Sequence, residues 1–145
     1  MRLVVDASVA IKWLLNEAGS AHAREFLERF RTGEDDLVAP DLIVSEIGNA
    51  LRSAAVLKRR IPTEVVAGAM ADFLRIELPT RSAGQTANRA VELALQHNAT
   101  FYDAAYVALA LEEGIPVLPT DGPMTEKFAG VAEFVKIRVD RPDEA

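Results

Sequence analysis

Short apolar runs and amphipathic stretches alternate along the chain. The apolar run Leu3–Val5 predicts a brief buried strand, and the spacing of Ala10, Trp13 and Leu14 predicts a helix over residues 8–16 with those side chains on one face. An acid separates the two segments, so the chain changes from apolar to polar where the strand ends.

The same alternation continues to the end of the sequence. Further helices are predicted over residues 20–31, 41–58, 63–74, 83–97 and 100–113, and further strands over residues 37–39, 75–78, 115–119 and 134–139. Ser20 and Asp41 are the expected N-caps of the first two of these helices, and Gly114 is expected to end the last. Strands that alternate with helices predict an α/β fold, a three-layer α/β/α sandwich with a mostly parallel central sheet.

The length of the chain suits a single domain. A chain of 145 residues can bury a sizeable hydrophobic core without disulfides or a structural metal. We expect one domain over residues 1–140, followed by a loose tail at residues 141–145. No apolar run approaches the roughly 20 residues that cross a bilayer, and the first residues lack the apolar stretch and cleavage site of a signal peptide. We therefore expect a cytoplasmic protein that makes no membrane contact.

Composition restricts the chemistry. The chain has no cysteine and only two histidines, so thiol nucleophiles and thiolate metal sites are excluded, and a metal would bind carboxylate oxygens or the histidines. The formal net charge of −6 is the opposite of the basic surface that coats nucleic acid. If the substrate is RNA, bound divalent cations and a local basic patch must overcome the repulsion.

Four of the 22 acids stand where a solvated charge is not the ordinary explanation. Asp6 and Asp121 each follow a predicted strand, which places them at the carboxyl edge of a parallel sheet, where α/β folds bind their ligands. Asp103 opens a helix that should begin at the same edge. Glu46 shares a helix face with apolar residues three and four positions away. Because an unpaired buried carboxylate is costly or takes up a proton, we expect Mg²⁺ or Mn²⁺ to be held by all four.

Each acid also has a purely structural interpretation. Asp6 could cap the helix that follows it, and Asp103 could form a capping box with Thr100. Asp121 precedes a glycine, which is a common turn pair. Glu46 is the hardest of the four to explain in this way. The joint pattern favours a metal site, because four separate accidents would all have to point toward one rim.

These acids also carry a resemblance to a known family. Four segments resemble, in order and spacing, the motifs of the PIN-domain family, and in particular of VapC-type toxin ribonucleases: VVDASVAIKW at residues 4–13, PDLIVSEIGNAL at 40–51, YDAAYVALA at 102–110 and VLPTD at 117–121. Each motif alone is weak. The four in order cover nearly the whole chain.

The resemblance implies a parallel-sheet α/β/α fold and a Mg²⁺- or Mn²⁺-dependent endoribonuclease in which the four acids hold the metal and carry catalysis. It also implies a homodimer and inhibition by a small antitoxin protein. Ser8 and Thr120 would belong to the polar shell of the site, although hydroxyls that satisfy turn backbone are an equal alternative. Many relatives carry further polar or acidic residues after the fourth acid, where this chain has Gly122, Pro123 and Met124. The resemblance therefore leaves the number of metal ions, one or two, open.

Metal-dependent hydrolysis is the expected mechanism. The cation would lower the pKa of a water molecule and neutralise charge on the scissile phosphate of single-stranded RNA. Lys12, Arg52 and Arg59 could contact RNA phosphates, although a solvated helix surface is the alternative for charges of this kind. Trp13 is expected in the core or at a dimer interface rather than beneath a base.

Other functions fit the residues less well. A response-receiver domain would carry a pair of acids after the first strand, whereas Asp6 is followed by Ala7 and Ser8, and a phosphatase of the haloacid-dehalogenase type would have a second Asp in place of Ser8. A PIN fold that only binds a partner would not need four intact acids. Acid–base catalysis by His22 and His97 would give cyclic phosphate products. It is disfavoured because one histidine lies on a polar helix stretch and the other near a helix end.

Overall fold

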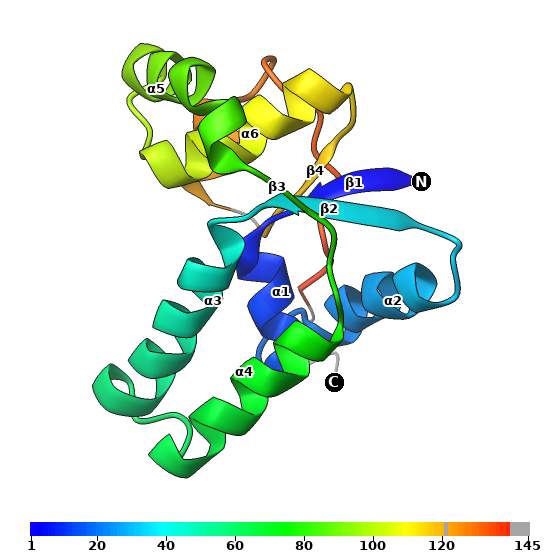
Figure 1. Ribbon diagram of the computed structural model, residues 1–145, viewed down its shortest axis with the longest axis vertical. Helices are drawn as coiled ribbons and strands as arrows, with labels where there is room; N and C mark the ends of the chain where they lie inside the picture. Colours follow the sequence, from blue (N-terminus) through cyan, green and yellow to red (C-terminus); the bar gives the residue numbers. More distant parts are fainter. Residues whose placement is uncertain (121, 140–145) are drawn as a thin grey trace.

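A parallel sheet lies at the centre of the computed structural model, which describes residues 1–120 and 122–139. Its strands are β1 (Arg2–Val5), β2 (Asp36–Pro40), β3 (Thr80–Arg81) and β4 (Val117–Leu118), in the order β3-β2-β1-β4. The named strands all pair in parallel, and β1 lies between β2 and β4 (Figure 1). Because β1 has neighbours on both edges and helices on both faces, Leu3, Val4 and Val5 are fully buried.

Helices cover both faces of the sheet. They are α1 (Ala7–Leu14), α2 (Ser20–Arg31), α3 (Ile43–Arg52), α4 (Val66–Arg75), α5 (Ala87–Gln96), α6 (Phe101–Glu113) and α7 (Pro123–Lys127), with short π- or 3₁₀-helical turns at Ser53–Leu57, Thr63–Val65 and Ala83–Gln85. In Figure 1, α5 and α6 lie above the sheet and α1 to α4 lie below it. The predicted three-layer sandwich with a mostly parallel sheet is therefore confirmed. Within the described ranges, no helix is both long and apolar enough to span a membrane.

Helix α6 fills the layer above the sheet. Its residues 104–110 are all buried, and the alanines among them allow the helix to approach β1 and β2 closely. Tyr106 lies within this segment and is fully buried. A buried tyrosine packs as an aromatic ring, but its hydroxyl needs a hydrogen-bond partner. The Tyr106 hydroxyl therefore links the hydrophobic core to a polar partner.

Two predicted helix caps are wrong. Ser20 is the first residue of α2 and follows Gly19, whose φ of +87° is the left-handed conformation that glycine adopts at low cost. The Ser20 hydroxyl donates to the carbonyl of Leu15 at 2.8 Å, so it closes the loop between α1 and α2 instead of capping the helix. Asp41 lies before the residue that caps α3, and its Oδ1 accepts a hydrogen bond from the amide of Ala83 at 3.1 Å.

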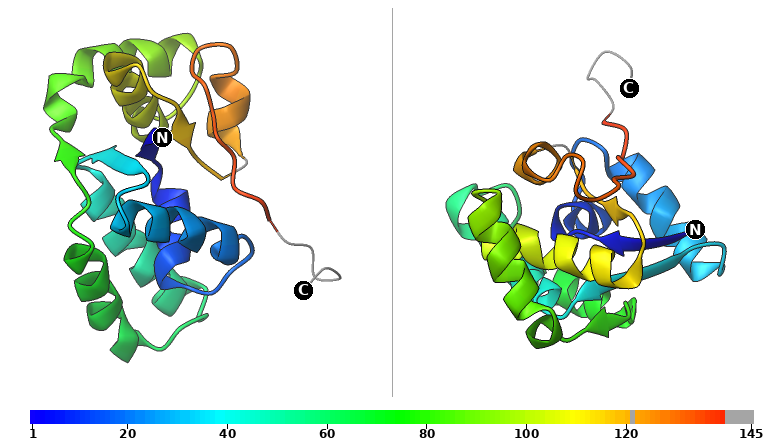
Figure 2. Two further views of the ribbon diagram at one scale, coloured as in Figure 1. Left: turned by 90° about the vertical axis from the view of Figure 1, so that its right-hand side faces the viewer. Right: turned by 90° about the horizontal axis from the view of Figure 1, so that it is seen from above.

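Two predicted strands are also wrong. Residues 75–78 end α4 and form a loop, and the short strand β3 follows them. Residues 134–139 form no strand; Phe134 makes a single parallel bridge to Val117, and the segment that contains it runs beside β4 (Figure 2). Apolar residues of both segments pack against the core, so the apolar pattern predicted burial correctly but not the backbone conformation. The tail expected at residues 141–145 lies outside the described residues.

Candidate metal centre

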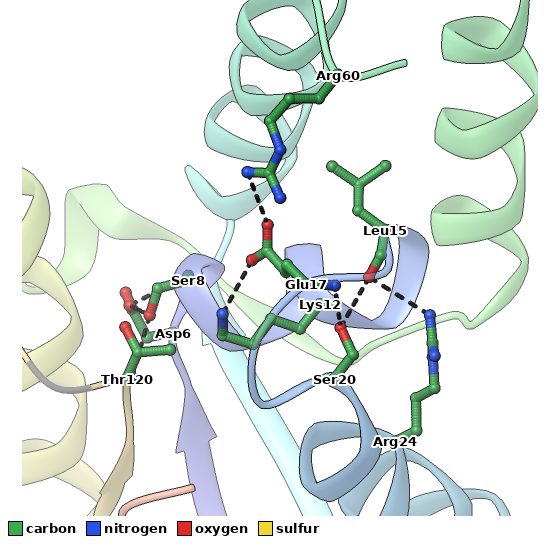
Figure 3. Close-up of polar contacts among 9 residues, drawn as sticks. All are labelled: Asp6, Ser8, Lys12, Leu15, Glu17, Ser20, Arg24, Arg60 and Thr120. Carbon is green, nitrogen blue, oxygen red and sulfur yellow. Dashed lines mark hydrogen bonds and ion pairs between the residues drawn. The ribbon is translucent and has the colours of Figure 1, made fainter. Parts of the chain in front are cut away.

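Asp6 lies directly after β1 and is the N-cap of α1. Its extended backbone turns the chain from strand to helix, and its Oδ2 accepts hydrogen bonds from the Ser8 amide, at 3.2 Å, and from the Ser8 hydroxyl. The Thr120 amide donates to the same hydroxyl at 3.2 Å (Figure 3). Burial raises the pKa of the Asp6 carboxyl to about 6, and the hydrogen bonds from Ser8 oppose this rise. The capping interpretation of Asp6 is thus correct: Ser8 holds its carboxylate, and the Thr120 amide contacts the Ser8 hydroxyl.

Glu46 lies in the first turn of α3 and reaches toward α6. Its Oε1 accepts a hydrogen bond from the hydroxyl of Tyr106 at 2.9 Å. Burial raises the pKa of Glu46 to about 7; the Tyr106 hydrogen bond opposes this rise, and the charges of Asp6 and Asp103 add to it. Burial and the carboxylates of Asp6 and Glu46 also raise the pKa of Tyr106, so its hydroxyl remains a donor. Among the described residues, no lysine or arginine pairs with Glu46.

Asp103 lies in the first turn of α6. Its amide donates to the Thr100 hydroxyl at 3.1 Å. This hydrogen bond is one half of the predicted capping box. Burial raises the pKa of the Asp103 carboxyl, and the charge of Lys127 opposes the rise. The capping role belongs to Thr100 and the Asp103 amide, which leaves a separate role for the Asp103 carboxylate.

Two of the candidate acids, Glu46 and Asp103, line a cleft of about 650 Å³. Its walls come from α3, from the π-helical turn after it and from the start of α6, and its lining residues are Ser45, Glu46, Asn49, Ala50, Ser53, Thr100, Tyr102 and Asp103. Apart from the two acids, every polar side chain in this lining is a neutral hydroxyl or amide. The cleft therefore combines concentrated negative charge with neutral hydrogen-bonding groups.

The chemistry of these acids fits a divalent cation. The charge of Asp103 raises the pKa of Asp6, and the charges of both raise that of Glu46, so all three act on one another. Among residues 1–120 and 122–139, however, no group of three or more His, Asp or Glu side chains is placed so that it could hold a metal ion. The fourth predicted ligand, Asp121, lies outside the described residues. Carboxylate oxygens, such as those of the buried Asp6 and the partly buried Glu46 and Asp103, are the donors that Mg²⁺ and Mn²⁺ prefer.

The predicted phosphate-binding residues lie outside the lining of the cleft. Lys12 donates to Glu17 Oε1 at 2.9 Å, and Arg60 approaches the other oxygen of the same carboxylate at 3.5 Å (Figure 3). Arg52, at the end of α3, and Arg59, in the loop that follows, are both exposed. The Lys12 ammonium is therefore already paired, whereas the two arginines are exposed at the end of α3 and in the loop after it.

The other side chains singled out by the sequence lie apart from the cleft. Trp13 is buried and donates to the carbonyl of Ala23 at 2.9 Å, which confirms its core position. His22 accepts a hydrogen bond from the Arg138 amide, and the His97 ring packs against an aromatic residue after α7. Neither histidine lines the cleft, so the structure gives no support to an acid–base pair there.

Two residues near the acids were not identified from the sequence. Tyr106 stands three positions after Asp103 and orients Glu46, and this spacing within one helix turn was the available signal. The positive charge of Lys127, on α7, opposes the rise in the pKa of Asp103. Its position depends on how the C-terminal segment folds back, which a pattern of apolar residues does not encode.

The fold and the acid-lined cleft define an α/β protein that gathers carboxylates at the carboxyl edge of a parallel sheet. A family model described as the PIN domain matches residues 3–131, and the chain belongs to this family. It is 36% identical over 132 residues to "Ribonuclease VapC3" of Pyrobaculum aerophilum, a match that covers 88% of this chain and 95% of the relative. It is also 36% identical over 118 residues to "Ribonuclease VapC1" of Mycobacterium tuberculosis, covering 81% of this chain and 84% of the relative.

Solved structures with the same fold include two from these organisms. PAE2754 from Pyrobaculum aerophilum superposes with a TM-score of 0.69 at 23% identity, covering 93% of this chain and 84% of the other. VapC20 from Mycobacterium tuberculosis, described as a sarcin–ricin loop cleaving toxin, gives a TM-score of 0.64 at 18% identity, covering 86% and 93%. At these identities the two structures bear on the fold alone, and they agree with the parallel α/β/α arrangement.

Proposed function

We propose that the chain is an endoribonuclease that cleaves single-stranded RNA with the help of Mg²⁺ or Mn²⁺ and serves as the toxin of a toxin–antitoxin pair. The observation that carries the proposal is the set of mutually repelling carboxylates Asp6, Glu46 and Asp103 at one edge of the sheet. The 36% identity to ribonucleases of the VapC group over most of the chain gives the reaction class. The chain is accordingly a nuclease of the PIN family.

In this proposal, Asp6, Glu46 and Asp103, together with Asp121, hold the cation. When bound, Mg²⁺ or Mn²⁺ would lower the pKa of a water molecule and neutralise charge on the scissile phosphate. The chain's own contribution is to fix the carboxylates and to limit the rise in their pKa through hydrogen bonds. Hydrogen bonds from Ser8 favour the charged form of Asp6.

Tyr106 has the corresponding role for Glu46. Its hydroxyl donates to Glu46 and favours the carboxylate over the neutral acid. Because Tyr106 is packed on all sides within α6, the direction of that hydrogen bond is fixed by the core. It is a positioning residue, since its hydrogen bond acts on a proposed ligand.

The alternatives from other classes lose their basis. The match to the PIN domain over residues 3–131 argues against a response-receiver domain and against a dehalogenase-type phosphatase. A PIN fold that only binds a partner would have no reason to retain mutually repelling carboxylates that are buried or partly buried, because each of them costs folding free energy. Catalysis is therefore the function that these residues support best.

The test is cleavage of end-labelled single-stranded RNA of mixed sequence in Mg²⁺ by the parent chain and by Glu46→Gln. The substitution removes one charge and keeps an oxygen that can accept the Tyr106 hydrogen bond. We expect fragments from the parent and a loss of at least roughly 100-fold in the variant, at or beyond the upper end of the losses caused by mutating residues around metal ligands. Equal cleavage by both proteins, or none by the parent, would refute the proposal.

We further propose a homodimer and a small antitoxin protein as partners, and the cytoplasm, where RNA is available, as the place of action. The outer face of α5 supports the dimer: Val91 and Leu95 lie four residues apart, with exposed fractions of 46% and 80%. Sedimentation of Leu95→Glu tests this, with a monomer expected where the parent is dimeric. For the antitoxin, the test is a short neighbouring reading frame whose product suppresses RNA cleavage.

A further inference from the structure

Tyr102 is an exposed aromatic side chain next to the acids. It lies in the first turn of α6, directly before Asp103, and 58% of its surface is exposed. Tyr106, one helical turn later, is completely buried. The described residues include every Phe, Tyr and Trp of the chain, and Tyr102 is the most exposed among them. An aromatic ring left in solvent at this position needs an explanation other than core packing.

The position of Tyr102 is in the cleft itself. It lines the space of about 650 Å³ together with Glu46 and Asp103. Its ring meets that of Phe101 edge-on, with centroids 6.4 Å apart and 76° between the planes. Phe101 packs against the core, so this contact supports the Tyr102 ring at the mouth of the cleft.

The charge of the cleft favours contact with RNA through an aromatic ring rather than through a basic side chain. No lysine or arginine is among its lining residues, and the protein carries a formal net charge of −6. Affinity for RNA usually comes from basic side chains on phosphates, and this cleft lacks them. Stacking on an aromatic ring requires no positive charge, because every base presents a π-face. Asn49, in the same lining, adds an amide that can donate to and accept from a base edge.

We infer that Tyr102 stacks on an unpaired base next to the scissile phosphate and thereby selects single-stranded RNA. The inference rests on the proposed ribonuclease function and names the residue that selects the single-stranded form of the substrate. Bases within a duplex already stack on their neighbours, so only a loop, a bulge or a free strand can offer a base to the ring. The base bound to Tyr102 lies near the scissile phosphate, because Tyr102 and Asp103 line the same cleft.

The experiment compares Tyr102→Phe, which keeps the ring, with Tyr102→Leu, which removes it. Leu74→Ala is the matched control, because Leu74 is similarly exposed, at 55%, but lies on α4 outside the cleft lining. Two quantities are measured on a short single-stranded RNA: kcat and KM in Mg²⁺, and the quenching of a 2-aminopurine base upon binding in Ca²⁺. We expect Tyr102→Leu to raise KM roughly ten-fold and to lose the quenching, as expected for one lost stacking contact. Tyr102→Phe and Leu74→Ala should resemble the parent.

A series of the same RNA, each member with one abasic nucleotide at a different position, separates a stacking role of Tyr102 from a structural role. One abasic position beside the cleavage site should slow the parent and Tyr102→Phe but add no further loss in Tyr102→Leu. If Tyr102→Leu keeps the parent's KM and quenching, or if the abasic position slows both proteins equally, the stacking role is refuted and Tyr102 is a contact for a protein partner or a surface residue. If the parent cleaves no RNA, the proposed function fails and this inference falls with it.

Discussion

The hydroxyl of Tyr106 lies 2.9 Å from Oε1 of Glu46 and donates a hydrogen bond to it. Tyr106 belongs to α6, above the sheet in Figure 1, and Glu46 belongs to α3, below it, so the bond joins the two helical layers at the carboxyl edge. It stabilises the ionised form of Glu46 against a burial effect that raises the pKa to about 7. The protonation state of Glu46 near neutral pH is therefore sensitive to the charge that binds beside it.

The first prediction is that Glu46→Gln leaves the metal-free protein as stable as the parent or more stable. Like charges on Asp6 and Asp103 oppose the ionised Glu46, and a neutral isostere relieves this repulsion while it still accepts the Tyr106 hydrogen bond. Mg²⁺ should then raise the melting temperature of the parent more than that of the variant, because the variant has lost a ligand. Thermal melts of both proteins in EDTA and in Mg²⁺ test this. A variant that melts far below the parent in EDTA would identify Glu46 as a structural ion-pair partner.

The second prediction concerns pH. The pKa of Asp6 rises from 3.8 to about 6 and that of Glu46 from 4.5 to about 7 on folding. Between about pH 4 and 7 the native state thus binds more protons than the unfolded state, so the stability contributed by these groups is complete below the lower values and is lost as pH rises through the upper ones. Mg²⁺ binds the ionised carboxylates, so its stabilising effect should grow over the same range.

Melting temperatures of the metal-free protein across this pH range, compared with those of Glu46→Gln, isolate the effect of one group. The parent should lose stability relative to the variant as pH rises from about 4.5 to about 7. If the difference between the two proteins is constant with pH, the pKa of Glu46 is not shifted by folding.

The third prediction is that cleavage leaves 5′-phosphate and 3′-hydroxyl ends. Water activated next to the carboxylates attacks phosphorus, and the 2′-hydroxyl of RNA takes no part. His22 and His97 have contacts elsewhere and do not line the cleft, so they are not available as an acid–base pair. End-group analysis of the fragments decides between the chemistries. Recovery of 2′,3′-cyclic phosphates would contradict the metal mechanism.

The fourth prediction concerns Glu17, which joins Lys12 of α1 to Arg60 of the loop before α4. The Lys12 and Glu17 side chains are only 12% and 17% exposed, so Glu17→Gln leaves a poorly solvated ammonium without its counter-charge. We expect a loss of about 1.5–3 kcal/mol in unfolding free energy, as for a hydrogen bond to a charged group. Urea denaturation provides the measurement.

Asp72→Asn is the matched control for this charge change. Asp72 pairs with Arg75 on α4, but the two side chains are 66% and 75% exposed, and such surface pairs contribute about 0.5 kcal/mol or less. Equal effects of Glu17→Gln and Asp72→Asn would mean that Lys12 is not held by Glu17 and is free to meet RNA.

The sequence predicted the fold class because strands buried on both faces are continuous apolar runs, as in Leu3–Val5, and the intervening helices have clear apolar faces. It failed at Ser20 and Asp41, because several nearby backbone groups compete for one polar side chain and only the folded chain decides which of them wins. It also failed at residues 134–139, where apolar side chains are buried without a strand.

For the candidate site, the strand-end position of Asp6 and the apolar helix face around Glu46 were visible in the sequence; Asp6 is buried, and Glu46 is partly buried. The partners Tyr106 and Lys127 were not predicted. Each depends on contacts between elements far apart in the chain, and a local pattern carries no information on such contacts. Asp121 remains a prediction, since it lies outside the described residues.

The most direct test of the central claim is RNA cleavage by protein stripped of metal, measured in EDTA and again after addition of Mg²⁺ or Mn²⁺, with Asp6→Asn and Asp121→Asn alongside the parent. The account predicts no cleavage in EDTA and recovery with either ion in the parent. Neither variant should recover, although both should keep the parent's fold by circular dichroism. Undiminished cleavage in EDTA, or full recovery by both variants, would contradict a metal centre built on these carboxylates.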